Sequence, residues 1–223
     1  MNAHNIKRQL LLILATLICL TTVIAQEKFP SKAVTFVVPQ APGGANDAIA
    51  RVIAQKLGEL TGQSFVVENR PGAGTTIAAE FVVKSAADGY TLLLTDLSTH
   101  AIMPSLYQKL AFNHGRDLIA VAPVSASPLI MAAHPSVGVR SAKELIALAK
   151  RSPGITCGNS GAGTVTHLAA EKFRTRAGID LLSVNYKGGT TSTVSLMTGE
   201  LSLIVNTIPA VLEHVKSRKL AAI

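Results

Sequence analysis

Residues that could bind a ligand or act on it occur in this sequence where buried apolar runs end. They supply hydroxyl, carboxylate, imidazole, amide and ammonium groups. The set comprises Asp47, Ser98, Thr99, Ser160, Thr164, His167, Tyr186, Lys187 and Asn206. Open α/β sheets bind their ligands outside the carboxyl ends of the strands. We therefore expect a ligand site to be built from the loops that carry these side chains.

Ser160 allows a catalytic interpretation. The run 158–162, GNSGA, approximates the nucleophile elbow of serine hydrolases, and His167 could act as the base. However, Ala162 stands where the final glycine belongs, and the next acid, Glu171, follows the histidine instead of preceding it. A serine at the start of a helix is also a common cap without any chemistry. A serine hydrolase using Ser160 and His167 therefore remains the alternative function.

Metal and cofactor chemistry are not expected from this sequence. The six histidines show no ligand spacing, and Cys157 is the lone cysteine beyond the first 25 residues. A single cysteine can form neither a zinc site nor an intrachain disulfide. A histidine one turn inside a helix, such as His167, more often packs or hydrogen-bonds than transfers protons. We expect no cofactor and no metal.

The first loop that could position a ligand lies between a predicted strand, 34–38, and a predicted helix that runs to Leu57 or Leu60. Two prolines and two glycines interrupt regular structure there, and Asn46 or Asp47 could cap the helix. Such a loop presents free backbone N–H groups at a helix N-terminus, which is a natural place to hold an anion. Gly43 and Gly44 also allow a ligand to approach the main chain closely.

A second glycine-rich loop, 158–164, repeats this arrangement elsewhere in the chain. It follows a short predicted strand, 155–157, and opens a helix that contains His167. The same physics therefore applies: small residues, then unpaired amides at a helix N-terminus. Lys187 follows another predicted strand, and spacing alone favours a ligand contact no more than a solvated lysine.

Strands and helices alternate along the remaining sequence, which predicts an α/β fold with a parallel sheet and right-handed crossovers. A capping-box pattern at Ser141 and Glu144 begins one helix, which continues to Lys150. The other expected helices are 75–85 and 103–110. The other expected strands are 65–67, 90–95, 119–124, 129–133, 181–184 and 201–205, with one more beginning at 219–223. We place a lobe boundary near residues 125–128.

The run Gly72-Ala73-Gly74 at a helix start could indicate dinucleotide binding. Ile77 occupies the position of the third glycine in that fingerprint, and no acid ends a following strand at the required distance. We discount this hypothesis.

Composition limits the class of partner. The 223 residues are 48% hydrophobic and 4% aromatic, with no tryptophan, which argues against a stacking surface for sugars or single-stranded nucleic acid. The formal net charge is +8, but the basic residues are dispersed. These properties favour a small anionic ligand and no nucleic-acid partner.

Residues 1–25 have the pattern of an export signal. Lys7 and Arg8 precede an apolar run, 10–20, and the small residue Ala25 fits the cleavage rule. The apolar run is shorter than the roughly 20 residues that span a bilayer. We expect cleavage after Ala25 and an exported protein.

Five motifs resemble one known family when they are taken in order along the chain. They are VPQAPGGANDAIAR, ENRPGAGTTIAAE, DGYTLLL, SGAGTVTHL and NYKGG. They resemble the tripartite tricarboxylate transporter substrate-binding proteins, called Bug receptors. The resemblance implies a type II-like periplasmic binding protein with two α/β lobes and no enzymatic activity. It also implies a small carboxylate, held in the cleft by main-chain amides and ordered waters and delivered to the membrane subunits of a transporter.

The same resemblance implies a set of ligand-binding residues. The two glycine-rich loops and a tyrosine-lysine-glycine turn match the family's binding loops, and Asn206 stands where members often carry aspartate. To these we add Ser98 and Thr99, which end the third strand. The matched residues are Pro42, Gly43, Gly44, Asp47, Ser160, Gly161, Gly163, Thr164, His167, Tyr186, Lys187 and Asn206.

The resemblance also implies a domain plan. Residues 26–124 form a first lobe, 125–220 a second lobe, and 221–223 the start of a return to the first lobe. Family members continue well beyond Ile223, so we expect the first lobe to be incomplete at its C-terminus. A non-functional, truncated receptor is therefore a further alternative.

Overall fold

A computed structural model describes residues 28–107 and 109–223. The expected signal segment 1–25 and its cleavage site lie outside the described residues. Among the described residues, no helix is both long and apolar enough to cross a membrane.

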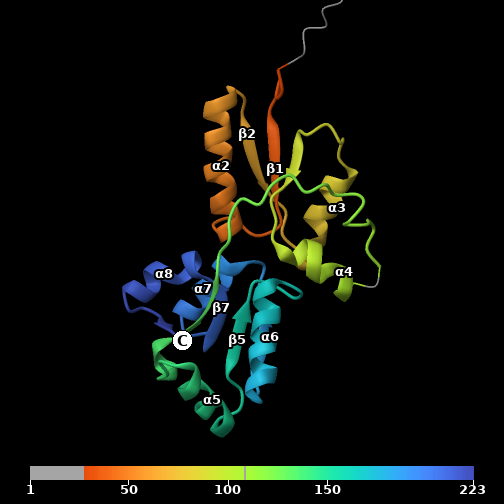
Figure 1. The fold of residues 1–223 in the computed structure, drawn as a ribbon. Coiled ribbons are helices and arrows are strands. Elements are labelled where there is room, and N and C mark those ends of the chain that lie inside the picture. The colour runs from red at the N-terminus through yellow and green to blue at the C-terminus, as the bar shows by residue number, and fades with distance from the viewer. Residues whose placement is uncertain (1–27, 108) are drawn as a thin grey trace, which may run out of the picture. The chain divides into compact units, whose positions relative to one another are not determined.

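The first sheet is parallel, with strand order β2-β1-β3. Its strands are β1 (Val34–Val38), β2 (Phe65–Asn69) and β3 (Thr91–Leu93). Val34 of β1 pairs with Phe65 of β2, and Val37 pairs with Leu93 of β3. The connecting helices are α2 (Ala45–Thr61) and α3 (Thr76–Lys84), which lie beside β2 and β3 (Figure 1). This half follows the alternation of strand and helix that the sequence predicts.

The second sheet has five strands in the order β6-β5-β7-β4-β8. They are β4 (Leu129–Ala133), β5 (Thr156–Asn159), β6 (Leu182–Asn185), β7 (Leu203–Thr207) and β8 (Ala221–Ala222). β5 runs parallel to β6 and β7, whereas β4 runs antiparallel to β7 and β8. The sheet is therefore mixed and not wholly parallel as the alternation predicts.

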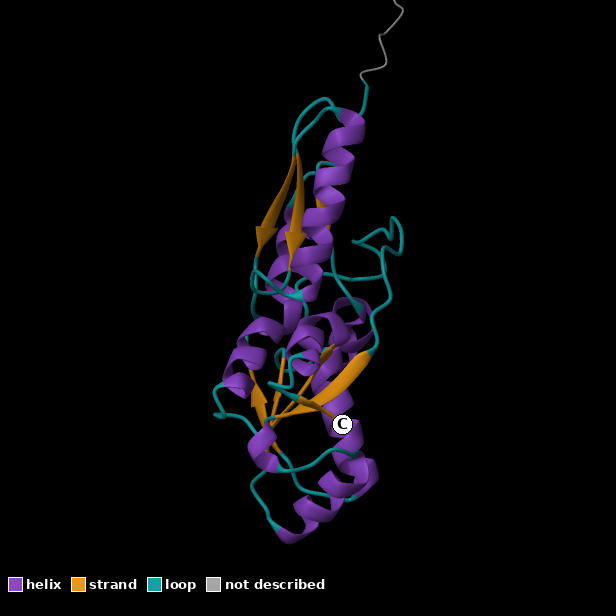
Figure 2. Ribbon diagram, turned by 90° about the vertical axis from the view of Figure 1, so that its left-hand side faces the viewer, coloured by secondary structure: helices purple, strands orange, loops and turns teal. Residues whose placement is uncertain are grey.

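Helices lie on both sides of the second sheet (Figure 2). They are α5 (Ala142–Arg151), α6 (Val165–Ala177), α7 (Gly189–Met197) and α8 (Ile208–Lys216). The predicted cap of α5 is confirmed, because Ser141 Oγ accepts a hydrogen bond from the Glu144 amide at 3.2 Å. Between the sheets, a π-helical turn (Ser98–Ile102) leads into the short helix α4 (Met103–Leu106).

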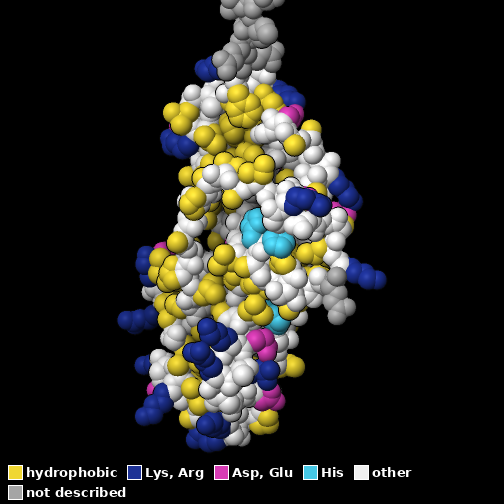
Figure 3. Space-filling view, turned by 45° about the vertical axis from the view of Figure 1, so that its right-hand side comes forward, with side chains coloured by type: hydrophobic (Ala, Val, Ile, Leu, Met, Phe, Trp, Pro, Cys, Tyr) yellow, Lys and Arg dark blue, Asp and Glu magenta, His cyan; other side chains and the backbone are white. Residues whose placement is uncertain are grey.

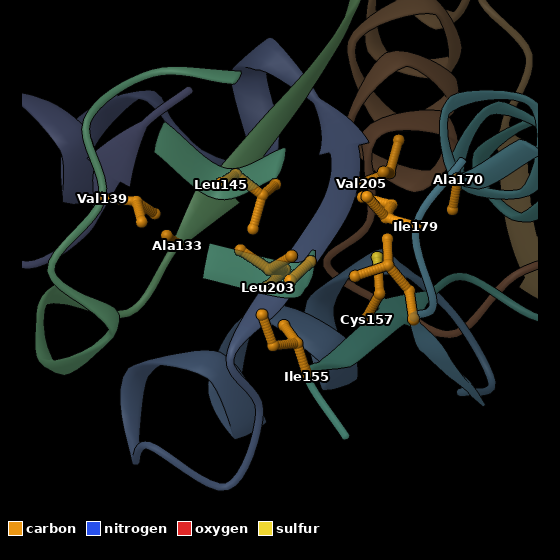
Figure 4. Close-up of a cluster of buried hydrophobic side chains, with 11 residues drawn as sticks. Ala133, Val139, Leu145, Ile155, Cys157, Ala170, Ile179, Leu203 and Val205 are labelled. Atoms are coloured by element: carbon orange, nitrogen blue, oxygen red, sulfur yellow. The ribbon is translucent and has the colours of Figure 1, made fainter. Parts of the chain in front are cut away.

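Two apolar clusters cover the second sheet. Leu203 and Val205 belong to one cluster and Ile204 to the other, so alternate residues of β7 serve opposite faces. Figure 4 shows the first cluster, in which Leu203 and Cys157 lie among side chains from several elements. Burial, with a smaller effect of the Glu171 carboxylate, raises the pKa of the Cys157 thiol to about 12. The cysteine is therefore a protonated core residue at neutral pH.

The predicted strand 119–124 does not form. This segment carries no regular structure, and the exposed fractions of Ile119 and Val121 are 90% and 82%. A strand needs a neighbour to take up its backbone hydrogen bonds, and no described strand pairs with this segment. An apolar groove of about 390 Å³ separates it from β1, β3 and α2. Figure 3 shows hydrophobic side chains gathered at the surface in the upper part of the view.

Two other expectations are corrected. The helix expected over 103–110 ends at Leu106, because Tyr107 has an extended backbone. Neither Asn46 nor Asp47 caps α2; its N-cap is Gly44, which has no side chain to make a cap hydrogen bond. Ala221 and Ala222 pair with β4 at the edge of the second sheet, and the expected return of the chain to the first lobe stays a prediction.

Candidate functional site

Four helix N-termini meet around one cavity in the described part of the chain. Gly44, Ala45 and Asn46 begin α2, Thr164 to Thr166 begin α6, Gly189 begins α7, and Thr207 precedes α8. The volume is about 50 Å³, enough for on the order of four water-sized groups. The wall is formed by Gln40, Gly44, Ala45, Asn46, Asp96, Ser160, Thr164, Val165, Thr166, Gly189, Asn206 and Thr207.

The positive part of the electrostatics of this cavity comes from the backbone, and Asp96 adds one carboxylate to the wall. Each helix N-terminus carries roughly half a positive charge, so four of them create a field that favours an anion. No lysine, arginine or histidine is among the described residues of the wall. In Figure 3 the Lys and Arg side chains are scattered over the surface and form no single basic patch.

The amides at the start of α2 are available to a ligand. Ala45, Asn46 and Asp47 occupy the first three positions of the helix, where no intrahelical acceptor exists. Within the described residues, none of these three N–H groups has a hydrogen-bond partner.

Two backbone amides at the start of α6 already donate hydrogen bonds to side chains of the protein. The Val165 amide donates to Ser98 Oγ at 3.1 Å, and the His167 amide donates to Thr164 Oγ1 at 3.4 Å. The amide of Thr166 has no partner among the described residues. Ser98 is fully buried, so it joins the third-strand loop to α6 and does not face the cavity.

Thr207 contributes an unused hydroxyl. Its Oγ1 is buried and has no hydrogen-bond partner in the described structure. Such groups are uncommon in folded proteins, since a buried polar atom without a partner loses its hydration. Because Thr207 belongs to the wall, a polar ligand atom could satisfy this hydroxyl.

Asn206 lines the cavity, but its side-chain amide already forms hydrogen bonds within the protein. Its Nδ2 donates to the carbonyl of Gly189 at 2.9 Å and to Thr193 Oγ1 at 3.1 Å. Its Oδ1 accepts from the Thr207 amide at 2.8 Å. Asn206 thus holds the starts of α7 and α8 in place.

The second glycine-rich loop is shaped by internal hydrogen bonds. The Ser160 amide donates to Thr166 Oγ1 at 2.9 Å, and Thr164 Oγ1 donates to the Gly161 carbonyl at 2.7 Å. Gly161 has φ +134°, and a Cβ there would lie 3.1 Å from the Tyr186 carbonyl oxygen. Gly163, with φ +76°, donates its amide to His167 Nδ1 at 3.3 Å. These glycines permit the backbone path, while Ser160 and Thr164 reach the wall.

Asp47 is buried and serves its own loop, not the cavity. Its carboxylate accepts hydrogen bonds from Arg51 Nε and from the Gly43 amide, both at 2.9 Å. Burial raises the pKa of Asp47, but hydrogen bonds from Arg51, the Gly43 amide and Asn69 outweigh it, so the pKa is lowered. The carboxylate is therefore charged at neutral pH and fixes the turn before α2.

The remaining predicted site residues lie outside the wall. Pro42 and Gly43 are exposed beside the loop, and the Lys187 side chain is exposed while its carbonyl accepts from the Ala41 amide at 3.3 Å. Tyr186 packs against the second apolar cluster. Thr99 is buried, with its hydroxyl 2.8 Å from that of Thr75.

The catalytic alternative finds no geometric support. No hydrogen bond joins Ser160 to His167 among the described residues, and His167 Nδ1 accepts from the Gly163 amide. A general base must lie within hydrogen-bond reach of its nucleophile, although this contact can be long without substrate. No group of three or more metal-ligating side chains occurs among the described residues either.

Sequence reasoning missed two-thirds of the wall. The missed residues are Gln40, Ala45, Asn46, Asp96, Val165, Thr166, Gly189 and Thr207. A usable signal existed for most of them, because they are the first residues of helices that follow the glycine-rich or strand-end motifs. For Asp96 the signal was an acid directly after the third strand, one position beyond Thr95.

Comparison with known families gives one match over most of the chain. The model of the tripartite tricarboxylate transporter family receptor matches residues 49–223. Protein BugT of Bordetella pertussis is 36% identical over 202 residues, which are 90% of this chain and 62% of BugT. The chain thus spans somewhat less than two-thirds of that relative.

Solved structures agree with this match. Rpa4515 of R. palustris with adipate has a TM-score of 0.84 at 33% identity, covering 87% of this chain and 66% of that chain. MatC (Rpa3494) from Rhodopseudomonas palustris with bound malate has a TM-score of 0.81 at 28% identity, with the same coverage of both chains.

Proposed function

Because the chain belongs to the tripartite tricarboxylate transporter receptor family, we propose that it is a periplasmic solute receptor for a small organic carboxylate. The ligand binds in the cavity between the two sheets and is delivered to the membrane subunits of a tripartite transporter. The protein performs no chemistry on it.

One observation carries this proposal: four helix N-termini surround a cavity, and no described residue of its wall has a basic side chain. Backbone N–H groups and helix dipoles bind a carboxylate without a cationic side chain. The free amides of α2 and Thr166 and the unpaired hydroxyl of Thr207 supply donors at several points of the wall.

The solved relatives support the ligand class. One is described with adipate and another with bound malate, and both are small organic acids. The proposal extends this ligand class to the present chain, which has the same fold.

A substitution that places a carboxylate in the wall tests the proposal. Val165→Asp puts a negative group at the first position of α6, where the helix dipole stabilises it. It should therefore fold, yet weaken binding of organic acids by about tenfold or more, or about 1.4 kcal/mol. Isothermal calorimetry against a panel of mono- and dicarboxylates measures the effect.

Two variants serve as controls. Val165→Asn has nearly the same shape without the charge, and it should retain most of the affinity. Leu168→Asp adds the same charge in the first turn of α6, but Leu168 is exposed and lies outside the wall. Equal affinity in Val165→Asp and Leu168→Asp would remove the cavity from the proposal. No saturable binding by the unaltered chain would favour the truncated, non-functional alternative.

The hydrolase alternative makes a separate prediction. A serine-reactive phosphonate should label Ser160 if that residue is a nucleophile, and Ser160→Ala should abolish the labelling. A receptor leaves the reagent unreacted.

A further inference from the structure

Asp96 is the single charged side chain in the described wall of the cavity. It follows β3, and its Oδ1 accepts a hydrogen bond from the Ser98 amide at 2.8 Å. That bond fixes the carboxylate in the loop. A carboxylate is unexpected in the wall of a cavity whose helix N-termini favour anions. Its position favours a ligand that carries a hydrogen-bond donor or a positive charge nearby.

The second oxygen of Asp96 is poorly satisfied. Its Oδ2 accepts from Gln40 Nε2 at 3.5 Å and from Asn46 Nδ2 at 3.4 Å. Both distances exceed the usual range of N–H···O hydrogen bonds, so these contacts are weak. Asn46 Nδ2 makes its shorter bond, 2.8 Å, to Gln40 Oε1. Oδ2 can therefore accept a short hydrogen bond from a further donor.

No cation of the described chain forms an ion pair with this carboxylate. Asp96 is absent from the ion pairs of the described residues, which also place no lysine, arginine or histidine in the wall. Asp96 is partly exposed and already accepts one short hydrogen bond, from the Ser98 amide. A donor carried by the ligand can add a second short bond, at Oδ2.

The two walls of the cavity differ in charge. On the side of the second sheet, α6, α7 and α8 present three N-termini and no acid. On the side of the first sheet, the N-terminus of α2 lies beside Asp96, because Asn46, the second residue of α2, donates from its side chain to Asp96 Oδ2. The second-sheet wall thus suits a carboxylate, whereas the first-sheet wall suits a hydrogen-bond donor at the position of Asp96.

We propose that Asp96 determines ligand specificity, by selecting carboxylates that carry a hydroxyl or ammonium group at the far end over those with a second carboxylate there. This inference rests on the proposed function. The ligand carboxylate meets the N-termini of the second-sheet wall, and the donor group hydrogen-bonds to Asp96 Oδ2. A second carboxylate would face Asp96 and be repelled by its charge.

A series of four-carbon acids tests this specificity. The members 4-hydroxybutyrate, 4-aminobutyrate, succinate and butyrate differ only at the far end, and the three-carbon series is measured in parallel to allow for length. Calorimetry should show that the unaltered chain prefers the hydroxyl or ammonium member over succinate by about tenfold or more, equivalent to about 1.4 kcal/mol.

The variant Asp96→Asn removes the charge and keeps an oxygen for the Ser98 amide. It should bring the ratio of affinities for the donor-bearing acid and succinate close to one, or reverse it. A loss confined to the ammonium member identifies an ion pair, and equal losses for hydroxyl and ammonium identify a hydrogen bond. Asp88→Asn is the matched control, because Asp88 is partly exposed and lies outside the wall.

The outcomes separate this inference from the proposed function. If carboxylates bind and Val165→Asp abolishes binding, but the ratio is unchanged in Asp96→Asn, only the role of Asp96 is overturned. If no carboxylate binds the unaltered chain, both proposals fail. Should Asp96→Asn not fold, Asn46→Asp adds a second carboxylate to the same wall. It must then increase the discrimination against succinate, and an unchanged ratio overturns the inference.

Discussion

Around the first sheet, the buried apolar cluster is small and consists of Val38, Ala50 and Leu94, whereas two larger clusters cover the second sheet. Other buried apolar residues of the first-sheet region, such as Val34 and Val37, lie outside this cluster. The first-sheet region instead relies on polar contacts at the ends of its strands. Asp47 joins Arg51 and the Gly43 amide, and Thr99 lies within hydrogen-bond distance of Thr75.

This difference separates two sources of stability. Apolar burial is non-directional and scales with area, so the second sheet has a stable core that does not depend on pH. Hydrogen bonds at loop ends contribute less each, but they fix the positions of the loops. The first-sheet region therefore holds site residues in place with a small core, and it should open more readily than the second-sheet region.

Hydrogen exchange measures the largest expected consequence of this comparison. Amides of β5 and β7 should exchange about a hundredfold or more slowly than amides of β1 and β3, because local opening is easier where few apolar contacts are lost. Mass spectrometry of peptides from the two sheets reports both sets in one sample. Equal protection of the two sheets would show that they unfold as one unit.

Matched leucine truncations sharpen the comparison. Leu203→Ala removes a fully buried side chain from the second-sheet core, and it should lower the free energy of unfolding by about 2–5 kcal/mol. Leu94→Ala, in the small first-sheet cluster, should lower it by less, because the surrounding structure is closer to solvent and can collapse into the cavity. Urea unfolding gives both free energies. A larger decrease for Leu94→Ala than for Leu203→Ala would contradict the view that the second sheet has the more stable core.

The pH dependence of stability should be concentrated in the first-sheet region. The pKa of Asp47 is lowered in the folded chain, so its contribution is fully present above the unfolded pKa, about 3.9. It is lost as pH falls through the lower, folded value. Asp47→Asn should therefore lower the free energy of unfolding by about 1–3 kcal/mol at pH 7, and by progressively less as pH falls below about 4.

Urea unfolding of Asp47→Asn at pH 7, 5 and 3 measures this dependence, with Asp88→Asn as the control. Asp88 is exposed, and its pKa is lowered by the hydrogen bond from the Tyr90 amide and by Lys32, against an opposing effect of desolvation. Its substitution should have a smaller effect. A difference between Asp47→Asn and the unaltered chain that stays constant down to pH 3 would show that the charge of Asp47 is not what matters.

Sequence reasoning predicted most regular elements, since their signals are local. Leu129–Ala133 is a strand with the predicted bounds, and Ser141 caps α5 through the expected spacing. The run 119–124 has an equally strong local pattern but forms no strand, because strand formation also needs a partner that the pattern does not reveal. The antiparallel pairing of β4 with β7 likewise depends on the path of the chain between the two sheets.

The sequence indicated which loops form the candidate site, but not which of their side chains face the cavity. Glycine-rich loops at helix starts were correctly seen, yet an acid in a first turn can face a ligand or reach back to its own loop. Arg51, four residues after Asp47, indicates that Asp47 serves its own loop, because side chains at this helical spacing can pair. Asp96 joins the site only because loops some 50 residues apart in sequence meet in space. No local pattern contains that information.

The hydrogen bond from the Val165 amide to Ser98 Oγ has a consequence for ligand exchange. The two residues are 67 positions apart, and the serine hydroxyl already occupies an amide at the start of α6. A carboxylate oxygen that reaches this amide must displace the hydroxyl, so the gain is the difference between two hydrogen bonds and not a whole one. Under the proposed function, Ser98 therefore competes with the ligand for this amide and reduces what the amide alone contributes to affinity.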